Sequence, residues 1–308
     1  MAITAKDVQK LREMTGVGMM DCKKALTASE GDFDKAIEWL REKGMAAQTK
    51  KAGKVAAEGM SFATVTEKGV GVIIEVNSQT DFVAKNEVFQ DFVMALTVVV
   101  AEENPADVAA LKACRYPGTD RTVDDVTADK VLAIGENIQI RRFARYAEGV
   151  NVPYIHMGGK VAVLVNMEVE GIEADKVTDL GKDVAMQICA MNPTYLDKSD
   201  VSQEVLDKEK EILLAQMAND PKMAAKPEKV KEGIVMGKLG KYYEENCLMQ
   251  QAFVKENKVS VEKHVAAVAK EVGGEIKIKG FYRFERGEGL EKKEENFAEE
   301  IAKQLGKA

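Results

Sequence analysis

Hydrophobic positions in the first 45 residues recur with the period of a helix. The third segment shows this most clearly, because its apolar residues stand at i, i+3, i+4 and i+7: Phe33, Ala36, Ile37 and Leu40. Gly16-Val17-Gly18 separates the first helix from the second, Gly31-Asp32 suits a helix end followed by an N-cap, and Gly44 would end the third helix. We therefore predict a three-helix domain over residues 1–45. A Lys-, Ala- and Gly-rich segment follows over 46–58 and is either a linker or a mobile helix.

Alternating and β-branched runs begin at Met60 and predict strands. Ser61–Val65 alternates, Lys68-Gly69 marks a turn, and Val70–Val76 is apolar and β-branched, as expected for a buried strand. The polar residues 77–81 then form a loop that leads into a helix. We expect the apolar side of this helix to comprise Phe82, Val83, Val88, Phe89, Phe92, Val93 and Leu96.

A similar order of elements returns in the second half of the chain. Val161–Val165 is a β-branched strand, residues 170–175 are polar, and a helix follows from Val177 to Met191. The parallel between residues 70–96 and 161–191 predicts a duplicated strand–strand–helix unit. Two ordinary α+β units that merely look alike are an equally good interpretation of this pattern.

Residues 201–248 have a different pattern, with apolar residues seven apart and charged residues between them. This pattern indicates two antiparallel helices in a hairpin that projects from the core. Its outer apolar face would contact a partner, such as a second copy of the chain, or would fold back on the chain's own core. Beyond the hairpin we expect a helix over His264–Val272, a strand over Ile276–Glu285 and a last helix over Asn296–Leu305.

The fold class expected from these elements is α+β. Residues 59–145 would form the N-terminal subdomain of the core. Residues 146–200 and 249–288 would form the first and second parts of a C-terminal subdomain, with the hairpin inserted between them. Residues 289–308 would form a C-terminal helical module.

Composition narrows the class of protein. The chain has 308 residues, 45% of them hydrophobic, and a net charge of −7, which argues against disorder and against direct nucleic-acid binding. Its four cysteines are far apart in the sequence and fit reduced, buried thiols rather than a zinc site. The start of the chain has no signal-peptide pattern, and no apolar run is long enough for a transmembrane helix, so we expect a cytoplasmic protein.

The sequence lacks the common motifs for nucleotide binding, metal binding and catalysis. It contains no P-loop and no Gly-rich dinucleotide-binding pattern. The two histidines, His156 and His264, argue against a His-based metal or catalytic site, and we expect His264 at the surface or at a boundary. Most acidic residues fall at solvated helix positions. We therefore expect neither an enzyme nor a cofactor, but a protein that acts by binding another protein.

Several long stretches, in the same order, resemble the bacterial translation elongation factor Ts family: Leu11–Leu26, Glu75–Ala84, Ile134–Ile138 with Arg141-Arg142, and Arg283–Lys292. The resemblance spans almost the whole chain and is weakest near 114–129 and in the hairpin. It implies an N-terminal module similar to the ubiquitin-associated fold, a two-part α+β core, and an inserted coiled-coil hairpin that some members use for dimerisation. It also implies a guanine-nucleotide exchange factor that binds elongation factor Tu and promotes GDP release, which regenerates Tu for GTP and aminoacyl-tRNA.

By the same resemblance, one loop acts on the Mg²⁺ site of the partner: Thr80, Asp81, Phe82 and Val83. Phe82 would insert between partner side chains and shift the elements near the Mg²⁺, while Asp81 brings negative charge into the same area. Thr80 and Val83 would shape the loop and anchor its helix. From the residues alone, Asp81 is explained at least as well as a helix N-cap, with Phe82 as the first core residue of that helix.

Further contacts implied by the resemblance involve the N-terminal helices. Met19 and Met20, in an exposed inter-helix loop, would form part of an apolar pocket for a helix of the partner, and Ile134 would join that contact. The alternative for both methionines is packing inside the three-helix domain. Arg12 would pair with an acidic residue of the partner, and its alternative is a solvated charge.

A second contact is implied near Tyr154 and His156, which would touch a β domain of the partner. We place both in a loop over residues 153–157, where binding residues are common, although a satisfied, half-buried histidine is a comparable interpretation. A different class of function, an adaptor or chaperone-type module that captures peptides or helices, would fit the N-terminal helices but leave the residue-80 loop unexplained. A one-to-one complex, a homodimer and a heterotetramer built on the hairpin are all compatible with the sequence.

Overall fold

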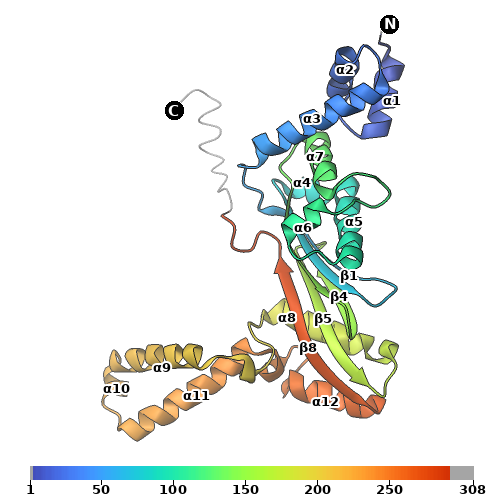
Figure 1. The fold of residues 1–308 in the computed structure, drawn as a ribbon. Coiled ribbons are helices and arrows are strands. Elements are labelled where there is room, and N and C mark those ends of the chain that lie inside the picture. Colours follow the sequence, from blue (N-terminus) through green and yellow to red (C-terminus); the bar gives the residue numbers. More distant parts are fainter. Residues whose placement is uncertain (1–2, 292–308) are drawn as a thin grey trace.

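Three helices form the N-terminal end of the chain in the computed structural model, which describes residues 3–291 (Figure 1): α1 (Ala5–Thr15), α2 (Met19–Ala28) and α3 (Phe33–Lys51). Thr4 and Asp7 cap α1 reciprocally, and the Asp32 side chain accepts hydrogen bonds from the first amides of α3. Gly16 ends α1 in the left-handed conformation, with φ of 68°. Leu11, Leu26 and their neighbours form a small core of their own. The predicted three helices, the end of α1 at Gly16 and the N-cap at Asp32 are confirmed. The second helix ends earlier than expected, with Ser29 as its C-cap and Glu30 in the left-handed conformation.

The third helix does not end at Gly44, as the sequence suggested, but continues to Lys51. Gly44 is buried where α3 crosses α7 (Val123–Ile134), and a Cβ atom at this position would lie 3.2 Å from the carbonyl oxygen of Ala128. The glycine therefore permits close helix packing instead of stopping the helix. Of the two interpretations of the segment after residue 45, the helix holds as far as Lys51, and a non-helical stretch leads from there to the first strand.

The first half of the core is a three-stranded antiparallel sheet in the order β1-β2-β3: β1 (Glu58–Val65), β2 (Gly71–Ser78) and β3 (Gln139–Tyr146). Three further helices accompany α7 on this half: α4 (Asp81–Ala84), α5 (Glu87–Glu103) and α6 (Val108–Ala113). Every residue of β2 is buried, because Val72, Ile74 and Val76 pack under the helices while Ile73 faces the second sheet. This two-sided burial explains the nearly continuous apolar run.

The single helix expected from Phe82 onward is instead two helices, α4 and α5. Asn86 interrupts them, because its side chain accepts a hydrogen bond from the Val88 amide and caps α5. Two of the apolar positions named for this helix, Phe82 and Val88, are exposed. The other apolar positions named for this helix, from Phe89 to Leu96, are buried as expected.

The second half contains a sheet with the same connectivity, in the order β4-β5-β8: β4 (Val150–His156), β5 (Val161–Glu170) and β8 (Glu275–Glu285). Helical cover comes from η1 (Ala174–Val177), α8 (Thr178–Met191) and α12 (Val261–Val272). In each half a strand hairpin is followed by helix, and the third strand pairs with the second across an irregular register. The expected strand–strand–helix order is thus present in both halves.

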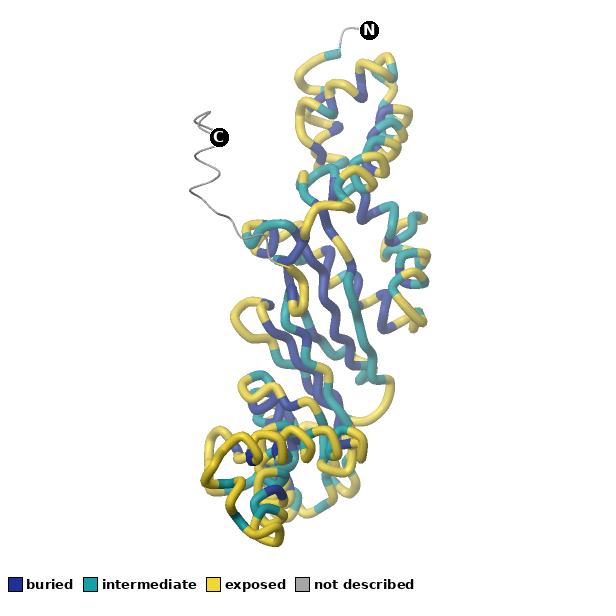
Figure 2. Tube along the Cα trace, turned by 90° about the vertical axis from the view of Figure 1, so that its left-hand side faces the viewer, coloured by how far each residue is buried: buried dark blue, intermediate teal, exposed yellow. Residues whose placement is uncertain are grey.

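The two sheets pack face to face through a shared layer of side chains: Ala63, Ile73, Ala162, Leu164 and Phe284. Figure 2 shows this middle of the molecule as mostly buried strands, with exposed segments toward both ends. Pro153, Tyr154 and His156 were expected in a loop, but they belong to β4. β4 is an edge strand, and a proline is tolerated there because its missing N–H costs no ladder bond.

The predicted hairpin projects from the second half (Figure 1): α9 (Gln203–Ala218), α10 (Pro221–Ala224) and α11 (Glu228–Asn246). Its buried seam is short, with Leu213, Met217 and Val235 at its centre. Small elements flank it: η2 (Lys198–Asp200), η3 (Leu248–Gln250), β6 (Ala252–Phe253) and β7 (Glu256–Ser260). Within residues 3–291, no helix is long and apolar enough to span a membrane. The last predicted helix, Asn296–Leu305, lies outside the described residues.

Candidate functional site

The residue-80 loop is short and firmly bonded. β2 extends through Ser78, so the polar loop expected over 77–81 is reduced to Gln79 and Thr80 before α4 begins. The Glu136 carboxylate accepts three hydrogen bonds from these two residues: from the Gln79 amide at 3.1 Å, the Thr80 amide at 3.0 Å and the Thr80 hydroxyl at 2.7 Å. The Ser78 hydroxyl also donates to the carbonyl of Thr80, at 3.0 Å. This bonding fixes the direction in which α4 leaves the sheet.

Phe82 projects from this fixed loop into solvent, with 78% of its surface exposed. Asp81 is the first residue of α4, and the Lys85 ammonium donates a hydrogen bond to its carboxylate at 3.0 Å. That bond holds the pKa of Asp81 below its ordinary value. The alternative in which Asp81 caps the helix and Phe82 enters the core is wrong, because Thr80 holds the N-cap position and Phe82 is exposed. Val83 is buried in the first core and anchors the helix.

A groove of about 310 Å³ lies beside Phe82 and joins three parts of the chain. Gly16 contributes from the N-terminal helices, Ile134 from the end of α7, and Phe82 from the loop, together with Val83, Asn86, Val88 and Ala133. The structure therefore brings Ile134 next to the residue-80 loop, although 52 positions (134 minus 82) separate Ile134 from Phe82. A groove beside an exposed aromatic side chain can receive a segment of another protein.

The three N-terminal residues named from the sequence are all exposed. Met19 and Met20 are 44% and 67% exposed and lie outside the core of the three helices, so the packing alternative is wrong. They are the first residues of α2, however, and not part of an inter-helix loop. Met20 lines a shallow groove of about 370 Å³ with Lys23, Lys24, Thr27 and Ala28. Arg12 is exposed on α1, and among residues 3–291 no carboxylate forms an ion pair with it.

Tyr154 and His156 meet on the edge strand β4. The Tyr154 hydroxyl and His156 Nδ1 lie 3.3 Å apart, and the two rings stack with centroids 6.1 Å apart. His156 is exposed, and both residues border a groove of about 390 Å³ that also contains Met186, Cys189 and Arg283. The turn after His156 lies against β1, since the Ser61 amide donates to the Gly159 carbonyl. Glu58, at the start of β1, pairs with Ser78, so both contact regions lie at the same end of the sheets.

A buried carboxylate, which the sequence motifs did not single out, lies near the loop. Glu75 on β2 is fully buried; its oxygens accept from Arg141 at 2.9 Å, from Arg142 at 2.6 Å and from the Gly287 amide at 2.7 Å. The Arg142 guanidinium also lies 4.3 Å from the ring centroid of Phe284 on β8. The only sign of this cluster in the sequence was one acidic residue, Glu75, inside an apolar strand. This cluster ties the loop's strand to both the third strand and the C-terminal segment.

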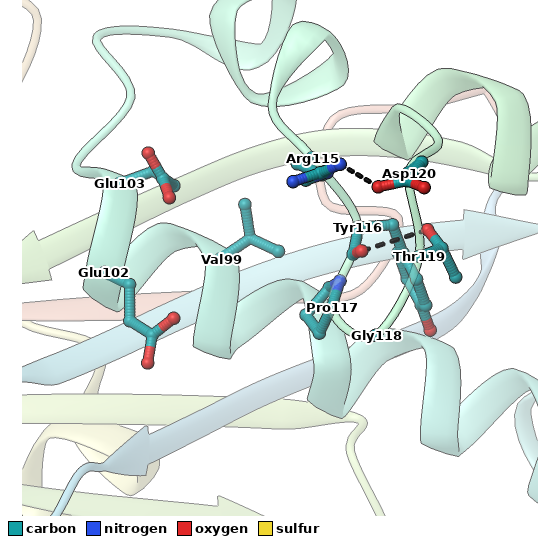
Figure 3. A pocket seen from close by; sticks show the side chains of 9 residues that line it. All are labelled: Val99, Glu102, Glu103, Arg115, Tyr116, Pro117, Gly118, Thr119 and Asp120. Atoms are coloured by element: carbon teal, nitrogen blue, oxygen red, sulfur yellow. Dashed lines mark hydrogen bonds and ion pairs between the residues drawn. The ribbon is translucent and has the colours of Figure 1, made fainter.

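The hollow in Figure 3, of about 420 Å³, contains none of the site residues named above. It is lined by α5 and the 115–120 loop. Within that loop Arg115 forms an ion pair with Asp120, and the Thr119 hydroxyl donates to the Tyr116 carbonyl. Within the described part of the chain, no group of three or more His, Cys, Asp or Glu side chains could hold a metal ion. The four cysteines are free thiols, and burial raises the pKa of each.

Comparison with known proteins agrees with the resemblance found in the sequence. The family model described as Elongation factor TS matches residues 79–288. The chain is 48% identical over 307 residues to elongation factor Ts of Clostridium kluyveri, an alignment that covers 98% of this chain and 99% of the relative. It is 49% identical over 308 residues to that of Clostridium perfringens strain SM101, covering 99% and 100% of the two chains. Elongation factor Ts of Syntrophotalea carbinolica is 45% identical over 304 residues, covering 98% and 99%.

These matches span both halves of the core, the hairpin and the N-terminal helices, and they include the residue-80 loop. The chain therefore belongs to the elongation factor Ts family, and it is a translation elongation factor of protein biosynthesis.

Proposed function

We propose that this chain is a guanine-nucleotide exchange factor: it binds elongation factor Tu with GDP, promotes release of the GDP, and so regenerates Tu for GTP and aminoacyl-tRNA. It acts by protein–protein binding and not by covalent chemistry. The observation that carries this proposal is the exposed Phe82 on a loop fixed by hydrogen bonds. A large apolar side chain that leaves 78% of its surface in water represents binding energy available to a partner.

The physical basis of exchange is reciprocal coupling. A GTPase holds its nucleotide largely through backbone amides and a bound Mg²⁺. A factor that binds the nucleotide-free form more tightly than the loaded form must weaken nucleotide binding by the same factor. Inserting Phe82 between elements near the Mg²⁺ site, with the negative charge of Asp81 beside it, is a means of binding the empty form selectively. Thr80 and Val83 hold the loop and its helix in place for this insertion.

The other exposed residues extend the proposed contact. Met19 and Met20 on α2 and Ile134 in the groove would receive a helix of the partner, because exposed methionines adapt readily to an apolar surface. Arg12, which pairs with no described carboxylate, would pair with an acidic residue of the partner. Tyr154 and His156 would form a second contact, with a β domain.

The finer description of the architecture is also part of this proposal. The three N-terminal helices would have the ubiquitin-associated fold, with a boundary after α3 at Lys51 instead of residue 45. The hairpin α9–α11 would be a coiled coil that forms a homodimer or a heterotetramer with two partner molecules. Exposed apolar side chains on it, among them Ile212 and Met236, support a role in association.

Release of a fluorescent GDP from elongation factor Tu in a stopped-flow instrument tests the proposal. The wild-type chain should accelerate release, and Phe82→Ala should reduce this acceleration about 10- to 100-fold, the equivalent of one buried phenylalanine side chain. The unfolding midpoint should not change, because Phe82 packs little in the free protein. Met94→Ala, which removes an exposed apolar side chain elsewhere on the first half, is the matched control.

Two results would contradict different parts of the proposal. No acceleration by the wild-type chain would refute the exchange function itself. Normal acceleration by the Phe82→Ala variant would leave the function standing and refute the insertion mechanism.

A further inference from the structure

We propose that Glu136 is a positioning residue for the exchange reaction: its carboxylate sets the place and direction of Phe82 by holding the two residues that precede α4. Glu136 itself is half-buried beneath the loop, so it would act through the loop. This inference rests on the proposed function, and it adds a residue to which the family resemblance gave no role.

The Glu136 carboxylate binds three donors from two consecutive residues. Oε2 of Glu136 accepts from the amides of both Gln79 and Thr80, at 3.1 and 3.0 Å, and Oε1 accepts from the Thr80 hydroxyl at 2.7 Å. A charged acceptor makes stronger hydrogen bonds than a neutral one, and three donors from consecutive residues leave the backbone little freedom to rotate. Phe82 follows only two residues later, so a change in these dihedral angles would swing its ring.

The Thr80 hydroxyl does not cap α4. Thr80 is at the N-cap of α4, where a threonine hydroxyl ordinarily accepts from an amide of the first helical turn, but here its side chain makes no capping bond. The hydroxyl donates to Glu136 instead. The start of α4 therefore depends on a side chain 56 residues away and not on a local cap.

The residues on either side of Glu136, Gly135 and Asn137, are also bonded to distant parts of the chain. Gly135 ends α7 in the left-handed conformation and turns the chain toward the loop, and its carbonyl accepts from the Lys51 ammonium at the end of α3. The Asn137 amide donates to the Gln79 side chain at 2.9 Å, while its side-chain amide donates to the Lys54 carbonyl at 2.8 Å. The turn 135–137 thus connects the end of the N-terminal helices to the residue-80 loop.

These bonds have a consequence for the proposed interface. The groove beside Phe82 has walls from Gly16, from Ile134 and from the loop. The turn at Glu136 is bonded to the loop on one side and to the end of α3 and the segment after it on the other. It would therefore hold the walls of the groove in a fixed relative position. Pre-organisation of this kind raises affinity by removing the entropy cost of ordering the loop during binding.

Chemistry at position 136 provides a graded set of variants. Glu136→Ala removes all three acceptor bonds. Glu136→Gln keeps a carbonyl oxygen for the two amides, and its NH₂ group can donate to the Thr80 hydroxyl once that hydroxyl rotates. Glu271→Ala is the matched control, because Glu271 is an exposed helical glutamate on α12.

Hydrogen exchange of the full chain alone tests the local part of the inference. The Gln79 and Thr80 amides should exchange at least about tenfold faster in Glu136→Ala than in the wild type, since each loses a charge-assisted hydrogen bond. Glu136→Gln should keep most of the protection, and Glu271→Ala all of it. The thermal unfolding midpoint of each variant separates this local effect from a loss of folding.

Nucleotide release from elongation factor Tu tests the functional part. Glu136→Ala should reduce the acceleration of GDP release about tenfold or more, for the same reason. The reduction should largely vanish when Glu136→Ala is added to Phe82→Ala, because a residue that acts by placing Phe82 has nothing left to place.

Unchanged exchange of the Gln79 and Thr80 amides in Glu136→Ala would overturn the inference. So would an equal loss of acceleration with and without Phe82, or a Glu136→Gln variant as impaired as Glu136→Ala. If the wild-type chain does not accelerate release at all, the proposed function fails, and the amide measurements alone still decide whether Glu136 holds the loop.

Discussion

Two residues near the end of β2 have the opposite burial to the one their side chains usually show: an aromatic residue is exposed and a charged residue is buried. Phe82 is aromatic and 78% exposed, whereas Glu75, seven positions earlier, is charged and fully buried. Exposed aromatic and buried charged residues are uncommon, because the first forgoes hydrophobic burial and the second gives up hydration. Here the exposed ring offers binding energy to a partner, and the buried carboxylate is compensated by two arginines and a backbone amide.

At the residue scale, we expect Glu75→Gln to destabilise the protein by about 2–4 kcal/mol, because it leaves Arg141 without its charge partner and Arg142 with only the pair to Glu288. This range lies below that for a fully buried pair, since 25% of the Arg141 side chain and 31% of the Arg142 side chain are exposed. Urea denaturation measures the change. Glu168→Gln, which breaks an exposed pair with Lys279, should cost no more than about 1 kcal/mol. Equal effects of the two substitutions would show that burial of Glu75 is energetically unimportant.

At the scale of elements, the glycines inside helices fall into two kinds. Some lie where another element packs closely against the helix, and others lie on an open surface. Gly44 on α3 and Gly181 on α8 lie where a helix crosses a neighbouring element closely, whereas Gly237 on α11 faces open space. In the sequence, Gly44 looks like a helix end because a glycine after a periodic segment usually has that role. Only the position of α7 shows that its missing side chain serves close packing.

This difference predicts opposite effects of the same substitution. A Cβ atom at Gly181 would lie 2.9 Å from Val152 Cβ and 2.9 Å from Met167 Cε, so Gly181→Ala should destabilise the protein by about 1–3 kcal/mol. Gly237→Ala meets no neighbour and should stabilise α11 by roughly 0.5–1 kcal/mol, because alanine loses less backbone entropy in a helix. Thermal and urea unfolding of the two variants check both signs, and a stabilising Gly181→Ala would contradict the close packing of α8 on the second sheet.

At the scale of the whole molecule, the two sheets form a central body with the N-terminal helices at one end and the hairpin at the other (Figure 1). The residue-80 loop, the groove beside it and the Tyr154–His156 pair all lie on the part nearer the N-terminal helices, because Ser78 and Gly159 both contact β1 near its start. The hairpin is therefore free to make contacts of its own while this end of the body engages a partner.

Cys247, where the hairpin rejoins the body, leads to a pH prediction. Burial, together with the charges of Asp197 and Asp200, raises the pKa of its thiol to about 11. The folded chain thus keeps this proton at pH values where the unfolded chain has lost it. The resulting stabilisation is complete below the ordinary thiol pKa of about 8.5–9 and is lost as the pH rises toward about 11.

We therefore expect the free energy of unfolding of the wild type to fall between pH 8 and 10.5 by on the order of 1 kcal/mol more than that of Cys247→Ala. Urea denaturation at the two pH values measures this difference. Parallel pH dependence of the two proteins would show that the Cys247 thiol does not contribute. Burial raises the pKa of Tyr242 to about 12, above this pH range, in the wild type.

Elements with a local signal could be predicted from the sequence. The expected type is found for the three N-terminal helices, for the strands that contain Gly71–Val76 and Val161–Val165, and for the projecting helices. Hydrophobic period and capping residues predict these elements because they act over a few positions. One error occurred where a distant neighbour decides, at Pro153, which pairs in β4 instead of lying in a loop. The other is local: Asn86 caps α5 and splits one apolar period into two helices. Of the named site residues, the structure shows which are exposed and which border a groove.

By itself, then, the sequence determined the fold class, the type of the strongly periodic elements and the family, since apolar periodicity and long motifs are properties of consecutive residues. Tertiary structure alone decided that Phe82 stays in water, that Ile134 and Gly16 border the same groove, and that Glu75 and Glu136 are bonded where they are. The physical reason is range. A pattern of residues states which faces of an element are apolar, but the donors that reach a given carboxylate come from segments more than fifty residues away, which meet only when the chain has folded.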